Sequence, residues 1–171
     1  MCIRDRNGTL SVMCGGDQAH FDTARPMIDA YASAVTRVGE VGAGQLTKMC
    51  NQILCVGAIQ GAAEAIAFGQ KAGLDMAQVL AAVSKGAAGS WYLSNRGEMM
   101  AGNDFPDGYG FAVDWMAKDI GIVQREAEAM GASIPLASLA AEYLSQAQAS
   151  GDNKLDVTAV VRQYRAANGL D

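Results

Sequence analysis

Lys48, Asn51 and Gln52 are the residues of this chain whose types and spacing best suit chemistry. Their positions fall within about one turn of a helix, so a helix here presents an amine and two amides on one face. Partial desolvation lowers the pKa of a lysine amine, which then exchanges a proton near neutral pH. Neighbouring carboxamides orient an oxygen-rich ligand by hydrogen bonding. The alternative is that Lys48 only extends its amine to solvent from the first turn of a core helix.

The second candidate is the pair Lys118-Asp119. At helical spacing Lys118 is flanked by Trp115 and Ile122, which are both apolar. This pattern indicates either a lysine that points into a cleft or a solvated lysine whose stem lies along Trp115. The spacing alone favours the second of these interpretations.

The composition excludes several other classes of protein. The chain has 171 residues, of which 50% are hydrophobic and 18% charged, and its formal net charge is -5. No basic stripe is present to neutralise phosphates, so we expect no nucleic-acid partner. One histidine and four cysteines without a C-x-x-C pair predict no metal site. The longest apolar stretch, 49–63, is shorter than the roughly 20 residues that cross a bilayer, so we expect a cytoplasmic protein with no membrane segment.

The first part of the chain, residues 7–39, has the pattern of a small α/β segment. Residues 9–14 loosely alternate and precede two glycines, which predicts a strand, and residues 34–38 predict a second strand. Between them, Asp17 predicts the N-cap of one short helix and Pro26 the first turn of another.

Beyond Gly44 the pattern is helical throughout. Residues 45–73 contain no proline and few charges, which predicts one helix about 43 Å long at 1.5 Å per residue. This helix is apolar nearly all round, so we expect other helices to cover it. Further helices are expected at 76–85, 90–101, 113–130 and 136–150, and from an Asp156 cap to about residue 166.

The segregated order of these elements predicts a mainly α protein. We expect an all-α C-terminal domain (42–171) built around one long central helix. A short α/β remnant of a truncated Rossmann domain (7–41) precedes it, with the boundary near residues 39–44. Residues 1–6 fit neither part and are interpreted as an artefact of sequencing or cloning.

Four stretches resemble the β-hydroxyacid dehydrogenase family, to which 3-hydroxyisobutyrate dehydrogenase and tartronate semialdehyde reductase belong. They are GTLSVMCGG (8–16), VGEVGAGQLTKMCNQ (38–52), AEAIAFGQKAGLD (63–75) and FAVDWMAKDIGIV (111–123), in the family's order. G-x-G-x-x-x-K-x-x-N together with the later KD-hydrophobic-G is more specific than either motif alone. The helical part is similar to the C-terminal domain of 6-phosphogluconate dehydrogenase.

The resemblance implies an NAD(P)-dependent oxidoreductase that moves a hydride between its cofactor and a small 3-hydroxy acid. By this resemblance Lys48 is the general acid/base for the hydroxyl proton, and Asn51, Gln52 and Gly44 contact the substrate. Gln52 stands where many relatives carry a second asparagine, so the identity of the acid stays open. The choice between NAD and NADP stays open as well.

The resemblance also assigns Lys118 and Phe111 to the cofactor and implies a homo-oligomer formed through the helical domain. The family's G-x-G-x-x-G pyrophosphate loop and its serine-glycine-glycine substrate loop are not found in this sequence. We therefore expect a C-terminal portion of the enzyme that is inactive alone. Two alternatives remain from other classes of protein: a non-catalytic all-α binding or oligomerisation module, and a helical ligand carrier.

Overall fold

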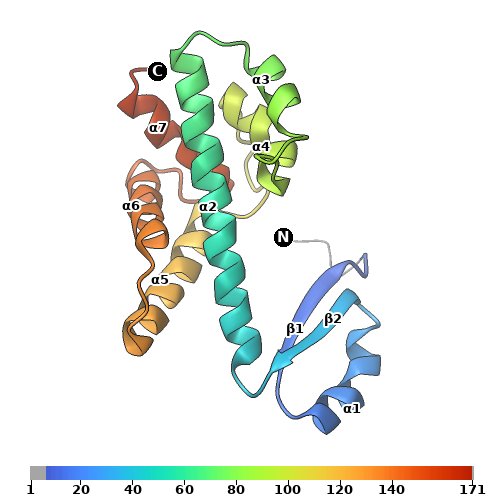
Figure 1. Ribbon diagram of the computed structural model, residues 1–171. Coiled ribbons are helices and arrows are strands. Elements are labelled where there is room, and N and C mark those ends of the chain that lie inside the picture. The colour runs from blue at the N-terminus through green and yellow to red at the C-terminus, as the bar shows by residue number, and fades with distance from the viewer. Residues whose placement is uncertain (1–6, 171) are drawn as a thin grey trace. The chain divides into compact units, whose positions relative to one another are not determined.

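A computed structural model describes residues 7–170 of the chain, and these form two compact units (Figure 1). The N-terminal unit extends through Gln52, and the C-terminal unit begins at Ile53, within the same helix. The segment 1–6, interpreted above as an artefact, lies outside the described residues.

The N-terminal unit is a β–α–β element. It contains β1 (Leu10–Gly15), α1 (Gln18–Ile28), β2 (Ala32–Gly39) and the first turns of α2 (Ala43–Lys71). The two strands pair in parallel, and a helical crossover is the usual connection between parallel strands. The expected cap of α1 is confirmed, because Asp17 Oδ1 accepts hydrogen bonds from the N–H groups of Ala19 and His20.

The expectation that Pro26 opens a separate helix is wrong. Pro26 lies in the last turns of α1, which runs unbroken to Ile28. The proline ring holds φ near its helical value but removes one N–H donor. The helix ends two residues later, at Ile28, so Pro26 lies just before the end of α1 and not at the start of a new helix.

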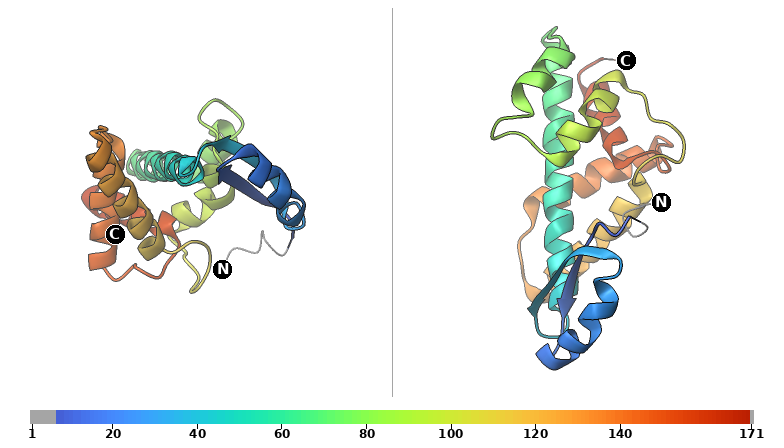
Figure 2. Two further views of the ribbon diagram at one scale, coloured as in Figure 1. Left: turned by 90° about the horizontal axis from the view of Figure 1, so that it is seen from below. Right: turned by 90° about the vertical axis from the view of Figure 1, so that its right-hand side faces the viewer.

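All the helices and strands that the structure describes in the C-terminal unit are helices, which together with the small parallel sheet confirms the expected mainly α fold. After α2 come α3 (Met76–Val83), α4 (Trp91–Gly102), α5 (Val113–Met130), α6 (Pro135–Ala149), the 3-10 helix η1 (Val157–Val160) and α7 (Val161–Ala167). Within this unit α3 and α4 lie on one side of α2, and α5 and α6 lie on the other (Figures 1 and 2). The expected cap at Asp156 is confirmed, although the turn it caps is a 3-10 helix rather than an α-helix.

Helix α2 supplies one side of the core, but it is not covered all round as expected. Its buried side chains in the C-terminal unit include Val56, Ile59, Ala63, Ile66 and Ala67. Leu54 and Phe68 are 74% and 71% exposed. The expectation of full cover is therefore wrong, because the other helices of the unit leave one apolar face of α2 open.

Helix α2 is also the one helix among the described residues that is long and apolar enough to cross a membrane, with a mean hydropathy of 1.3. That criterion uses length and composition only. Half of the apolar window is buried inside the protein, and the core helix of a globular protein meets the same criterion.

The start of α5 is held by a segment that lies far along the chain. No side chain caps this helix. Instead, the N–H groups of Val113 and Asp114 donate to the carbonyl oxygens of Leu155 and Asn153, at 3.0 and 3.1 Å. The Asp114 carboxylate accepts hydrogen bonds from Gln148 Nε2 at 2.7 Å and from Asn153 Nδ2 at 3.1 Å.

These hydrogen bonds hold the pKa of Asp114 below its usual value, and the bond from Gln148 has the largest effect. A lowered carboxyl pKa stabilises the fold above the pKa of the unfolded chain, and the stabilisation is lost as the pH falls through the lower, folded-state value. We predict that Asp114→Asn lowers the free energy of unfolding at pH 7 and that its difference from the wild type shrinks towards zero in strong acid. Urea unfolding followed by circular dichroism between pH 2 and 7 measures this difference.

The matched control is Glu128→Gln, which removes a carboxylate from an exposed position of the same helix. This variant should keep the pH dependence of the wild type. An Asp114→Asn protein whose stability difference stays constant with pH would contradict the assigned role of the carboxylate.

Candidate functional site

Lys48, Asn51 and Gln52 lie on α2 within the N-terminal unit and are joined by side-chain hydrogen bonds. Lys48 Nζ donates to Gln52 Oε1 at 2.7 Å, and Asn51 Nδ2 donates to the same oxygen at 2.8 Å. Gln52 is 5% exposed, whereas Lys48 is exposed. The grouping of an amine and two amides on one helical face is therefore confirmed, and their chemical role stays a prediction.

Gly44, at the start of α2, lies directly against the backbone of β1. A Cβ atom at this position would stand 2.6 Å from the carbonyl oxygen of Met13 and 3.1 Å from the nitrogen of Gly15. The glycine is therefore required by packing inside the N-terminal unit. Its expected contact with the substrate stays a prediction beside this structural role.

Phe111 is held at the start of α5 by main-chain hydrogen bonds. Its N–H group donates to Asp156 Oδ2 at 3.0 Å, and its carbonyl oxygen accepts from the N–H group of Val157 at 2.7 Å. The residue is 39% exposed, so its ring is accessible to a ligand. Asp156, which the sequence identified only as a helix cap, thus also positions this candidate cofactor residue.

Lys118 lies on the outer face of α5. Its Nζ is 2.9 Å from Asp119 Oδ1 and 5.7 Å from the centroid of the Trp115 ring, and its side chain is 56% exposed. This placement matches the second interpretation of the pattern, a solvated lysine beside Trp115. The amine remains accessible to an anionic or carbonyl group of a cofactor, and that contact stays a prediction.

The pair Cys55 and Tyr92 joins α2 to α4 within the C-terminal unit, and the sequence did not indicate this contact. Burial, and then the neighbouring Cys55 thiol, raise the pKa of Tyr92 above its usual value. The phenol is therefore protonated at neutral pH and acts as a hydrogen-bonding group. No sequence pattern joins two residues so far apart, so only the tertiary structure shows the pair.

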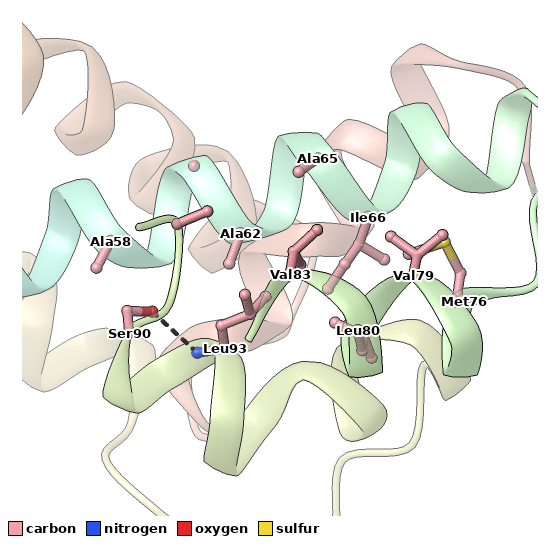
Figure 3. Close-up of a pocket in the computed structure, with 12 residues that line it drawn as sticks. Ala58, Ala62, Ala65, Ile66, Met76, Val79, Leu80, Val83, Ser90 and Leu93 are labelled. Atoms are coloured by element: carbon pink, nitrogen blue, oxygen red, sulfur yellow. Dashed lines mark hydrogen bonds between the residues drawn. The ribbon is translucent and has the colours of Figure 1, made fainter. Parts of the chain in front are cut away.

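A cavity of about 470 Å³ lies between α2, α3 and the segment that leads into α4 (Figure 3). Its walls are formed by Ala58, Gly61, Ala62, Ala65, Ile66, Met76, Val79, Leu80, Val83, Ala88, Ser90 and Leu93. The only polar side chain among these is Ser90, whose hydroxyl oxygen accepts a hydrogen bond from the N–H group of Leu93 at 3.1 Å. The cavity therefore suits apolar side chains of a partner rather than catalysis.

Two family models match the chain and together cover most of it. Residues 42–164 match the NAD-binding domain of NADP-dependent 3-hydroxyisobutyrate dehydrogenase, and residues 3–39 match the NAD-binding domain of 6-phosphogluconate dehydrogenase. Both matched family models describe NAD-binding parts of dehydrogenases. The chain belongs to the β-hydroxyacid dehydrogenase family, which confirms the resemblance seen in the sequence motifs.

The relatives are considerably longer than this chain. An uncharacterized oxidoreductase of Shewanella frigidimarina is 47% identical over 91% of the chain and 53% of its own length. The 3-hydroxyisobutyrate dehydrogenase of Pseudomonas aeruginosa is 36% identical over 94% of the chain and 56% of its own length. The crystal structure of a 3-hydroxyisobutyrate dehydrogenase from Salmonella typhimurium aligns with a TM-score of 0.83 at 34% identity, over 94% of the chain and 56% of that structure. The chain thus spans about half the length of the curated relatives it matches.

The close contact of Gly44 with β1 leads to a local prediction. Gly44→Ala places a methyl group against backbone atoms that cannot rotate away. Overpacking of this kind costs about 1–3 kcal/mol. We predict that this variant speeds amide hydrogen exchange in β1 and β2, as measured by mass spectrometry.

Gly61→Ala is the control on the same helix, because no atom lies within 4 Å of the added methyl group. This second variant should leave exchange in β1 unchanged. Equal protection of the strands in wild type and Gly44→Ala would contradict the packing role of the glycine.

Proposed function

We propose that this chain supplies the lysine-bearing part of an NAD(P)-dependent 3-hydroxy acid dehydrogenase. The observation that carries the proposal is the hydrogen-bonded group of Lys48, Asn51 and Gln52 at the N-terminal end of α2. It joins the proton-exchanging group and the hydrogen-bonding amides of the expected site on one rigid element. The family assignment supports the same chemistry.

Lys48 acts as the general acid/base in this proposal. Gln52 Oε1 accepts a hydrogen bond from the lysine amine and so orients it. The remaining hydrogen and the lone pair of the neutral amine face the substrate. In the oxidation direction a neutral amine takes the proton of the substrate hydroxyl, and in the reduction direction the ammonium returns it. Asn51 holds the substrate's oxygens beside the amine.

The cofactor supplies the carbon-bound hydride chemistry when it is bound. Two accessible side chains of the C-terminal unit fit its nicotinamide end, the ring of Phe111 and the amine of Lys118. The N-terminus of α1 does not fit a pyrophosphate, because the Asp17 carboxylate already accepts from the N–H groups there and repels an anion. The chain alone is therefore proposed to be inactive.

The domain boundary is proposed to lie between residues 39 and 42. The two family models end and begin at these positions. The segment between them contains Gly42, whose φ of 93° favours glycine. Residues 7–41 then form the remnant of the cofactor domain, and 42–171 form the helical domain.

The role of Lys48 can be tested in a chimera. This chain is fused to the part of the S. frigidimarina relative that it does not span, and oxidation of 3-hydroxyisobutyrate is followed by NADH or NADPH absorbance. We predict that Lys48→Ala lowers kcat by about 100- to 10,000-fold, the usual contribution of a general acid/base. Lys85→Ala, at an exposed position outside the site, should leave turnover unchanged.

A Lys48→Ala chimera that keeps its turnover within about threefold would contradict the assigned role. Titration of the chain alone with NADH, followed by nicotinamide fluorescence, is the matching control. We expect no binding tighter than about 1 mM. Micromolar binding would contradict the proposal that the isolated chain holds an incomplete cofactor site.

We also propose that the chain forms a homo-oligomer through its helical domain. The open face of α2 supports this, since Leu54 and Phe68 flank the small residues Ala58, Gly61 and Ala65 at helical spacing. Leu54 and Phe68 each lie seven residues from Gly61, so an antiparallel second copy would place large side chains against large ones and small against small. Such self-complementarity is what a two-fold interface requires.

The oligomer proposal leads to a prediction for this face. Changing Leu54 and Phe68 together to Glu places two charges on the open face, which should shift the chain from dimer or larger to monomer. Light scattering after size-exclusion chromatography at about 50 µM measures this mass. Met130→Glu, at an exposed apolar position of α5, is the control and should keep the mass of the wild type. A monomeric wild-type chain would contradict the proposal.

A further inference from the structure

Arg96 of α4 lies between two aromatic rings in the C-terminal unit. Its guanidinium carbon is 4.9 Å from the centroid of the Trp91 ring and 4.7 Å from that of the Tyr109 ring. The two residues are 49% and 47% exposed, whereas the arginine side chain is 13% exposed. Rings on both sides fix the plane of the guanidinium and keep its charge weakly hydrated.

The neighbouring carboxylate does not account for this arginine. Asp156 Oδ2 is 3.6 Å from Arg96 Nε, too far for a hydrogen bond, and Nε is buried without a hydrogen-bond partner among the described residues. The carboxylate already accepts three other hydrogen bonds, from the N–H group of Phe111 and from the N–H and hydroxyl groups of Thr158. Nε therefore forms an ion pair with Asp156 without a hydrogen bond, and the donors that remain for a ligand lie on the opposite side of the guanidinium.

The remaining edge of the guanidinium has donors to offer. Nη1 donates to the carbonyl oxygen of Asn95 at 3.0 Å and to the hydroxyl oxygen of Tyr109 at 3.2 Å. No residue in the described range 7–170 accepts a hydrogen bond from Nη2. Nη2 therefore keeps N–H donors for a carboxylate oxygen, and the flat guanidinium fixes the direction in which they point.

We propose that Arg96 binds the carboxylate of a small organic acid between the half-exposed rings of Trp91 and Tyr109. Asp156 lies on the Nε side of the guanidinium and repels an incoming anion. The affinity of the site is therefore modest, with a dissociation constant in the millimolar range.

The position of this site relates it to the proposed reaction. Asp156 Oδ2 both accepts from the N–H group of Phe111 and faces Arg96, so the carboxylate site adjoins the segment that holds a candidate cofactor residue. The identification of the ligand as a 3-hydroxy acid rests on the proposed function. The presence of a carboxylate site at Arg96 does not, since every residue that forms it belongs to the C-terminal unit.

The test uses the fluorescence of Trp91 in the full chain. The sequence has two tryptophans, so Trp115→Phe leaves Trp91 as the single reporter. Three probes are titrated without cofactor: 3-hydroxypropionate, 1,3-propanediol as its uncharged analogue, and inorganic phosphate. We expect a saturable change with 3-hydroxypropionate, none with the diol, and at least tenfold weaker binding of phosphate.

Arg96→Gln should weaken binding of 3-hydroxypropionate at least tenfold, and Arg125→Gln, at an exposed position of α5, should not. If Arg96→Gln does not fold by circular dichroism, Arg96→Lys keeps the charge but loses the planar edge, and it should also bind more weakly. Wild-type affinity in these Arg96 variants, equal binding of the diol, tighter binding of phosphate, or no saturable change in the wild type would each overturn the inference. None of these outcomes changes the effect of Lys48→Ala on the turnover of the chimera. The carboxylate site and the proposed function can therefore be refuted independently.

Discussion

The C-terminal unit depends on the burial of one apolar side of α2. This helix has only three charged side chains along its 29 residues, so most of its surface is apolar and burial of that surface away from water is favourable. Helices α3 to α7 cover the side that includes Ile59 and Ile66, and these residues belong to the continuous core of the unit. Leu54 and Phe68 keep their apolar side chains exposed, which supports the proposed contact with a second copy.

A second constraint is the satisfaction of polar groups that the helices bury. Asp156 is 3% exposed and accepts hydrogen bonds from Phe111 and Thr158, so a single carboxylate joins the start of α5 to η1. Gly110 is required beside it, because its φ is 78° and a side chain there would collide with the carboxylate. The Asp156 carboxylate thus holds the starts of two helices together and positions a candidate cofactor residue.

Local patterns were sufficient to predict most elements and one candidate site. Caps at Asp17 and Asp156 are short-range hydrogen bonds between a side chain and the next turn, so the sequence alone predicts them correctly. The grouping of Lys48 with Gln52 is also local, because residues four apart in a helix are neighbours. The start of a second helix expected at Pro26 was wrong, because the pattern of single residues does not distinguish a proline in the first turn of a helix from one near its end.

The contacts of Arg96 with Tyr109 and Asp156, and of Cys55 with Tyr92, could not be predicted, because these partners lie far along the chain and no periodic pattern joins them. The sequence by itself determined the helical class, the family and the amine–amide face of α2, since each depends on neighbours within a few residues. Only the tertiary structure decided which face of α2 stays open, that Gly44 must lie against β1, and that a carboxylate and an aromatic pair surround Arg96. Those features depend on how helices pack, and packing is a property of surfaces brought together from distant parts of the chain.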